Sequence, residues 1–150
     1  MNPRTPHISV VVPLYNKAPY VLRCLESIRR QSFQDFEAIV VDDGSTDGSG
    51  SIAAGLSDPR FVVVRQQNRG SGAARNRGVA ETKSEIIAFL DADDAWEEDY
   101  LKAITDLANQ FPAAGVFATG YRRCMGTGWT RKSLCGKSEV RPASLMIISR

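Results

Sequence analysis

The densest group of reactive side chains in this 150-residue sequence is Asp91-Ala92-Asp93-Asp94, directly after the apolar run 86–90. Three carboxylates within four residues repel one another and lose hydration unless a cation or hydrogen-bond donors compensate. Mg²⁺ or Mn²⁺ would do this, because one or two carboxylates typically hold such an ion together with phosphate oxygens and water. The alternative is a solvated turn that caps the next helix. Asp91, Asp93 and Asp94 are therefore candidate metal ligands.

A second acidic pair, Asp42-Asp43, follows the apolar run 36–41 and opens into Gly44-Ser45-Thr46-Asp47. A carboxylate at this place could accept hydrogen bonds from a nucleobase N–H or a ribose hydroxyl. Spacing alone favours neither ligand contact nor a structural turn for Asp43. Asp47 or Thr46 could cap the helix that follows.

Small residues and two arginines occupy the segment 68–76, which reads NRGSGAARN. The small residues permit close approach of the backbone to a ligand, and an arginine can pair with a diphosphate. Arg75 is the better candidate of the two, and a surface salt bridge is the alternative account of it. Tyr15 and Asn16, after the first apolar run, could pack against a flat base and hydrogen-bond to it, although simple packing is the commoner role for such an aromatic.

The candidate residues follow predicted strands of an α/β fold. Short β-branched apolar runs at 8–12, 36–41, 61–64 and 86–90 predict buried strands, and their continuous hydrophobicity is typical of a parallel sheet covered on both faces. Four helices are predicted between and after these strands. The first has Pro19 in its first turn and an apolar face formed by Val21, Leu22, Leu25 and Ile28. Two weaker helices are predicted at 48–56 and 70–80, and a more strongly amphipathic one at 100–111. Ligands of such folds bind beyond the carboxyl ends of strands, where these candidates lie.

The composition, with 43% apolar and 24% charged residues, predicts a single globular domain. The net charge of +2 is unevenly spread, because residues 1–110 carry 12 basic and 16 acidic side chains and residues 111–150 carry seven and one. The basic part could face an anionic ligand, a membrane surface or only solvent. Three cysteines without a C-x-x-C pair indicate neither a disulfide framework nor a zinc ribbon, and favour a reducing cytoplasm.

Several motifs in the same order resemble family 2 glycosyltransferases. They are ISVVVPLYN at 8–16, IVVDDGSTD at 39–47, the segment 68–76 and DADD at 91–94. The resemblance covers residues 8–111 and implies a GT-A-type fold, a Rossmann-like and mostly parallel sheet flanked by helices. It also implies inverting, metal-dependent transfer of a sugar from a UDP- or dTDP-sugar to an acceptor hydroxyl, as in polysaccharide biosynthesis.

The same resemblance implies roles for individual residues. Pro13, Tyr15 and Asp43 would hold the base, Asp93 the ribose, and Arg75 would lie near the diphosphate. Asp91, Asp93 and Asp94 would form the D-x-D-type region, in which Asp93 or Asp94 reaches a Mg²⁺ or Mn²⁺ ion directly or through water.

The expected organisation is a leader at 1–7, a donor-binding region at 8–111 and the beginning of an acceptor-side region at 112–150, where weaker strands are predicted at 116–121 and 144–148. An apolar run near the last residue suggests the front part of a longer protein. The family places its general base in its second half, so no catalytic residue is assigned here, and the chain is expected to bind donor but transfer sugar poorly. Expected partners are a nucleotide-diphosphate sugar and a carbohydrate or lipid-linked acceptor, without nucleic acid, and the longer protein could associate peripherally with a membrane.

Two other functions remain open from the residues alone. A nucleotidyltransferase is also a metal-dependent α/β enzyme, but it usually carries a glycine-rich basic loop after its first strand, which 13–16 lacks. A noncatalytic nucleotide-binding module could retain the same fold. A nucleophile triad has no support, because the single histidine, His7, lies away from the other candidates.

Overall fold

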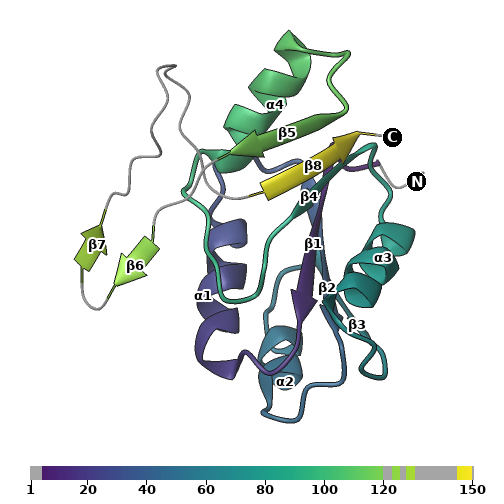
Figure 1. Cartoon of the computed structure of the whole chain (residues 1–150), viewed down its shortest axis with the longest axis vertical. Coiled ribbons are helices and arrows are strands. Elements are labelled where there is room, and N and C mark those ends of the chain that lie inside the picture. The colour runs from purple at the N-terminus through teal and green to yellow at the C-terminus, as the bar shows by residue number, and fades with distance from the viewer. Residues whose placement is uncertain (1–4, 120–122, 126–127, 131–144, 150) are drawn as a thin grey trace.

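The computed structural model describes residues 5–119, 123–125, 128–130 and 145–149. In chain order the elements are β1 (Ile8–Leu14), α1 (Ala18–Arg29), β2 (Phe36–Asp42), α2 (Ser49–Ala54), β3 (Phe61–Arg65), α3 (Ser71–Glu81), β4 (Ile86–Phe89), α4 (Tyr100–Gln110), β5 (Val116–Thr119), β6 (Arg123–Met125), β7 (Gly128–Thr130) and β8 (Leu145–Ser149) (Figure 1). The four predicted strands and four predicted helices of the first 111 residues are confirmed, with boundary shifts of one or a few residues. In the described ranges, no helix is both long enough and apolar enough to cross a bilayer.

Six strands form one sheet in the order β3-β2-β1-β4-β8-β5. β1 pairs in parallel with β2 and with β4, and β2 pairs in parallel with β3. β8 lies antiparallel between β4 and β5, so the two weaker predicted strands also belong to this sheet. The chain moves from β1 outward to β3 and then returns to β4 on the other side of β1. This reversal opens a crevice beyond the carboxyl ends of β1 and β4, where open α/β sheets bind ligands.

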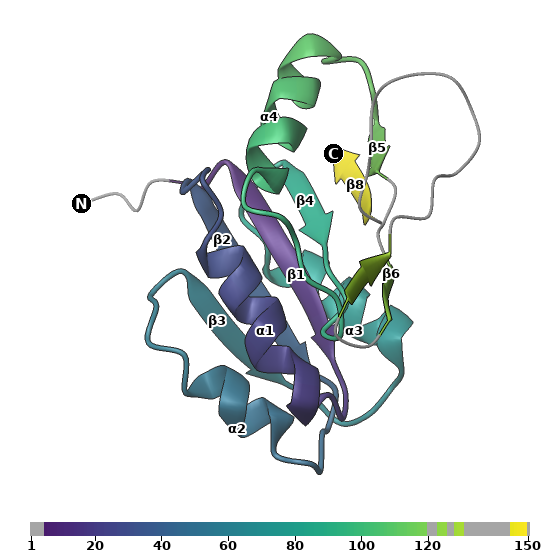
Figure 2. The same ribbon diagram turned by 90° about the vertical axis from the view of Figure 1, so that its left-hand side faces the viewer.

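The side chains of β1 alternate between two layers of core. Ile8, Val10, Val12 and Leu14 pack on the face that carries α1 and α4, and Val11 packs on the opposite face with Ile87 and Phe89. On that second face Ala74 and Val79 of α3 contact the sheet. Figure 2 shows α1 lying across one face of the sheet with α3 behind it. Covering on both faces, as predicted, therefore holds for the central strands.

Gly78 sets the distance between α3 and β1. A Cβ atom at this position would lie 2.3 Å from Cγ1 of the buried Val11, closer than real Cβ contacts. The missing side chain thus lets the helix backbone rest against the strand. Arg75, one turn earlier in α3, is brought over the same strand by this contact.

Two predicted apolar positions and one strand differ from expectation. Leu22 is 52% exposed, because the buried face of α1 consists of Val21, Cys24, Leu25 and Ile28. Phe111 follows the end of α4 and is 51% exposed. Val62 is 45% exposed because β3 is the edge strand of the sheet and lacks a neighbour on one side.

Candidate active site

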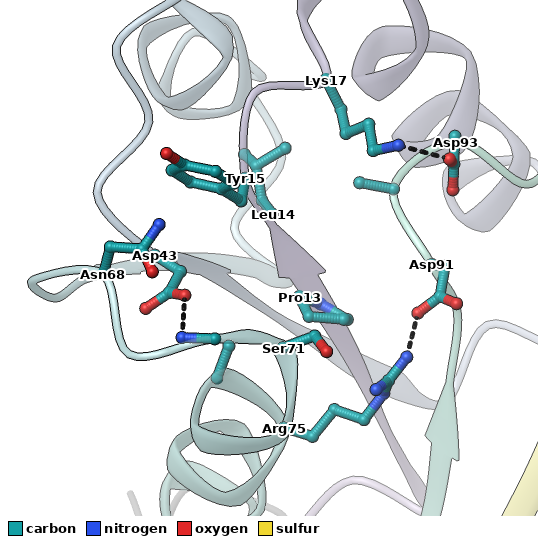
Figure 3. A pocket seen from close by; sticks show the side chains of 13 residues that line it. Pro13, Leu14, Tyr15, Lys17, Asp43, Asn68, Ser71, Arg75, Asp91 and Asp93 are labelled. Carbon is teal, nitrogen blue, oxygen red and sulfur yellow. Dashed lines mark hydrogen bonds and ion pairs between the residues drawn. The ribbon is translucent and has the colours of Figure 1, made fainter.

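A cavity of about 480 Å³ lies beyond the carboxyl ends of β1, β2 and β4, within the size range of small-molecule sites. Six of the seven predicted site residues line it, namely Pro13, Tyr15, Asp43, Arg75, Asp91 and Asp93 (Figure 3). Asp94 is not among its lining residues. The folding pattern therefore brings together residues that are up to 80 positions apart in the sequence.

Asp43 holds the loop that enters α3. It is 2% exposed, its Oδ1 accepts hydrogen bonds from Gln66 Nε2 at 2.7 Å and Arg69 N at 2.9 Å, and its Oδ2 accepts one from Gly70 N at 2.8 Å. Burial by itself would raise the pKa of Asp43, but these hydrogen bonds outweigh it and the pKa lies below its usual value. Asp43 thus stabilises a turn, and because it also lines the cavity, its contact with a ligand stays a prediction.

The pKa of Asp43 predicts how acid affects folding. Because its pKa is lower in the folded chain than in the unfolded chain, its stabilising contribution is complete above the unfolded value of about 3.9 and is lost as pH falls through the folded value. Asp43→Asn is expected to lower the free energy of unfolding at pH 7 by about 1–3 kcal/mol, because three donors lose their carboxylate. Urea unfolding at pH 7, 5, 4 and 3 measures the difference.

As the pH falls, the difference in free energy of unfolding between wild type and Asp43→Asn is expected to decrease. Asp106→Asn is the control, since Asp106 makes an exposed ion pair with Lys102 on α4. A gap between wild type and Asp43→Asn that stays constant down to pH 3 would show that the Asp43 charge does not stabilise this loop.

The loop between β1 and α1 is fixed to the loop after β2. Asn16 has a positive φ of 48°, its Oδ1 accepts from Thr46 N at 2.9 Å, and its own N–H donates to Ser45 Oγ at 3.2 Å. The N-cap position of α2 is Gly48 and neither Asp47 nor Thr46, but Asp47 accepts hydrogen bonds from Ala18 N at 2.8 Å and Ser49 N at 2.9 Å, the first residues of α1 and α2. The Asn16 side-chain oxygen therefore holds a loop, while the neighbouring Tyr15 is 46% exposed beside the cavity.

Gly44 brings the loops after β2 and β3 together. Its φ is +76°, and a Cβ atom there would lie 3.0 Å from Asn68 N. A side chain at this position would be strained and would push Asn68 away from Asp43. Asp43 and Gly44 together thus position the loop after β3, whose residues Asn68 and Gly70 line the cavity.

Side-chain cations from three other elements neutralise much of the acidic loop after β4. Lys17 Nζ lies 2.6 Å from Asp93 Oδ2, and Arg75 Nη2 lies 2.5 Å from Asp91 Oδ1 (Figure 3). Arg23 of α1 donates to the Asp93 carbonyl oxygen at 2.8 Å. The Lys17 hydrogen bond lowers the pKa of Asp93 and in turn raises that of Lys17. Arg75 is in a salt bridge, as the alternative account proposed, but its partner belongs to the candidate site.

Asp94 differs from its two neighbours because no ion pair is seen for it among the described residues. Its pKa is raised, first by desolvation and then by the charges of Asp93 and Asp91. A divalent ion would relieve this repulsion, and an all-oxygen donor set suits Mg²⁺ or Mn²⁺. No three acidic, cysteine or histidine side chains in the described part of the chain gather into a ligand set. The residues thus fit an ion shared with a diphosphate and do not fit a complete protein cage.

Sequence reasoning missed the polar lining residue Lys17. Asn68 and Ser71, which also line the cavity, belong to the segment 68–76 that drew attention to Arg75, but they were not assigned individual roles. Lys17 directly follows the predicted Tyr15-Asn16 pair, so its place after the first strand could have indicated that it lies at the site. Its partner Asp93 is 76 residues away, and a single sequence carries no information on that pairing.

A Rossmann-like, mostly parallel sheet with polar side chains around the crevice at its strand ends defines the class of α/β folds that bind ligands at this place. The model of the family described as Glycosyl transferase family 2 matches residues 9–146. The chain belongs to this family. The match also extends past residue 111, where the recognisable motifs ended.

Individual proteins agree with this assignment. Succinoglycan biosynthesis protein ExoW of Rhizobium meliloti (strain 1021) is 41% identical over 118 residues, which are 75% of this chain and 37% of that protein. S. aureus TarS 1–349, solved in complex with UDP-GlcNAc, has a TM-score of 0.74 at 28% identity, covering 83% of this chain and 37% of that one. Mannosyltransferase PcManGT from Pyrobaculum calidifontis, in complex with GDP-Man and Mn²⁺, has a TM-score of 0.70 at 29% identity, covering 78% and 36%. The chain spans well under half of the length of the curated relatives it matches.

Proposed function

We propose that this chain is the donor-binding part of an inverting, metal-dependent glycosyltransferase that uses a UDP- or dTDP-sugar. The observation that carries this proposal is that one cavity at the β1/β4 crevice collects an exposed aromatic ring, a guanidinium group, and aspartates from the loops after β2 and β4. A nucleotide sugar presents a flat base, a ribose and a diphosphate. The aromatic ring suits the base, an aspartate suits the ribose hydroxyls, and the guanidinium group suits the diphosphate. The UDP-GlcNAc and GDP-Man complexes of the structural neighbours support a donor of this class.

Each side of the cavity then receives one part of the donor. Tyr15 and Pro13 flank the base, and Asp43 Oδ2 accepts a hydrogen bond from its N–H group. Asp93 accepts from the ribose hydroxyls. Arg75 leaves Asp91 and pairs with the diphosphate, for which its planar guanidinium group is well suited.

The transfer step follows from the charges that develop. Asp93 or Asp94, with Asp91 nearby, would hold a Mg²⁺ or Mn²⁺ ion, which would supply positive charge to the departing diphosphate. Arg75 stabilises the same negative charge as the bond between sugar and phosphate breaks. The acceptor hydroxyl attacks the anomeric carbon from the opposite face and gives its proton to a carboxylate base. That base is expected outside this chain.

The remaining assignments concern the acceptor and the compartment. A carbohydrate or lipid-linked acceptor would approach the side of the sheet formed by β5 and β8, within the proposed acceptor-side region at 112–150. ExoW, a relative named for polysaccharide biosynthesis, supports such an acceptor class. The buried thiol of Cys24 is free, which supports the proposal that the protein resides in a reducing cytoplasm.

Calorimetric titration with UDP tests the proposed function. Wild type is expected to bind UDP at least about 10-fold more tightly with Mn²⁺ than with a chelator, and Asp93→Ala is expected to lose about 10- to 100-fold in affinity together with the metal effect. Asp106→Ala, which removes an exposed aspartate on α4, is the matched control. Asp93→Ala binding UDP as tightly as wild type would refute the assigned site.

A further inference from the structure

Lys17 combines a fixed backbone with a side chain that can move. The residues on both sides of it are anchored, since Asn16 is hydrogen-bonded to Ser45 and Thr46 and the Ala18 N–H donates to Asp47. The Lys17 side chain itself is 39% exposed, and among the described residues its ammonium group has one hydrogen-bond partner, Asp93. Because its backbone is fixed and its side chain is flexible, Lys17 places a mobile positive charge at the rim of the cavity.

Asp93 is contacted by two cations, one at its backbone carbonyl oxygen and one at its side-chain carboxylate. Its carbonyl oxygen accepts from Arg23, which ties the backbone of the acidic loop to α1. Its carboxylate Oδ2 lies 2.6 Å from Lys17 Nζ, and its side chain is 42% exposed. Loss of the Lys17 contact would therefore free the carboxylate while the Arg23 contact keeps the loop in place.

A divalent ion that binds Asp93 would meet the ammonium group of Lys17 on the same carboxylate. A divalent ion and an ammonium group on one carboxylate repel each other, so binding of the ion at Asp93 weakens the Lys17 contact and favours its departure. Asp91 has the same arrangement with Arg75, but that residue already faces the proposed diphosphate position. Lys17 is the cation whose place the metal would take.

We propose that Lys17 is an exchangeable counter-ion of Asp93, which occupies this carboxylate in the free protein and moves to the donor diphosphate when a divalent ion replaces it. This inference rests on the proposed function. It makes metal binding and donor binding cooperative, because the diphosphate offers Lys17 a new anionic partner at the moment when Asp93 is given up. In the absence of nucleotide, Lys17 therefore competes with the metal.

The test measures Mn²⁺ affinity of the whole chain without nucleotide, from the electron paramagnetic resonance signal of free Mn²⁺. Lys17→Met is expected to bind Mn²⁺ about 5- to 30-fold more tightly than wild type, because one competing ion pair is removed. Lys102→Met is the matched control, since Lys102 also pairs with an aspartate, at 2.8 Å, but on α4 outside the cavity. It is expected to leave Mn²⁺ affinity unchanged.

A second measurement uses UDP in the presence of saturating Mn²⁺, the condition under which Lys17 is proposed to leave Asp93. Lys17→Met is expected to bind UDP about 3- to 10-fold more weakly than wild type, since the ammonium group is no longer available to the diphosphate. In an Asp93→Asn background, Lys17→Met is expected to leave Mn²⁺ affinity unchanged, because the shared carboxylate is absent.

Equal or weaker Mn²⁺ binding by Lys17→Met, including undetectable binding by both proteins, overturns the inference. If wild type still binds UDP more tightly with Mn²⁺ in that case, the proposed donor site stands and only the counter-ion role is wrong. If wild type binds no UDP with or without Mn²⁺, the proposed function is wrong and the inference is overturned with it.

Discussion

Arg75→Met is expected to weaken UDP binding by about 10- to 100-fold, because a charge-assisted hydrogen bond to an anion contributes about 1.5–3 kcal/mol. Arg75 lines the cavity from α3, and its guanidinium group is already directed at the acidic loop through Asp91 at 2.5 Å. The existing ion pair keeps the side chain close to the proposed diphosphate. Calorimetric titration with UDP in the presence of Mn²⁺ gives the affinity.

The control for this prediction lies two residues further along the same helix. Arg77 also forms an ion pair, with Glu81 at 2.7 Å, but it does not line this cavity. Arg77→Met is expected to change UDP affinity less than about twofold, as usual for an exposed ion pair. Equal losses in the two variants, or no loss in Arg75→Met, would show that the positive charge of α3 acts only at long range or has no role.

Gly78→Ala is expected to lower the free energy of unfolding by about 1–3 kcal/mol, which is the usual effect of overpacking a tight core. The added Cβ atom would lie 2.3 Å from Val11 Cγ1 and would force α3 away from β1. For a chain of this length the melting temperature is expected to fall by about 3–10 °C. UDP affinity is expected to fall as well, since Arg75 moves with the helix.

Gly72→Ala is the matched control in the same helix, because nothing lies within 4 Å of its added Cβ atom. Its melting temperature is expected to stay constant or rise, since alanine exceeds glycine in helix propensity by up to about 1 kcal/mol. A Gly78→Ala variant as stable as Gly72→Ala would contradict the close packing of α3 on β1.

Much of the fold could be predicted because the signals are local. Continuous apolar β-branched runs identified β1, β2, β3 and β4, and the spacing of Val21, Leu25 and Ile28 identified α1. The antiparallel position of β8 between β4 and β5 could not be predicted. Strand order depends on contacts between distant segments, and the weak pattern after Pro112 carried no information on direction.

The candidate site was predicted in position but not in its internal contacts. The rule that ligands bind beyond strand ends located Asp43, Asp91 and Asp93 correctly around one cavity. The sequence also indicated that the acidic loop needs positive charge. It could not show that Lys17 and Arg75 supply that charge, because such pairs depend on how loops far apart in the sequence meet.

The most direct test of the nucleotide-sugar site is a crystal structure of this chain with UDP and Mn²⁺. The uracil ring is expected beside Tyr15 and the diphosphate between Arg75 and the 91–94 loop, with Mn²⁺ next to that loop. Nucleotide and metal bound away from the β1/β4 crevice, with the Lys17–Asp93 and Arg75–Asp91 pairs intact, would contradict the proposed site.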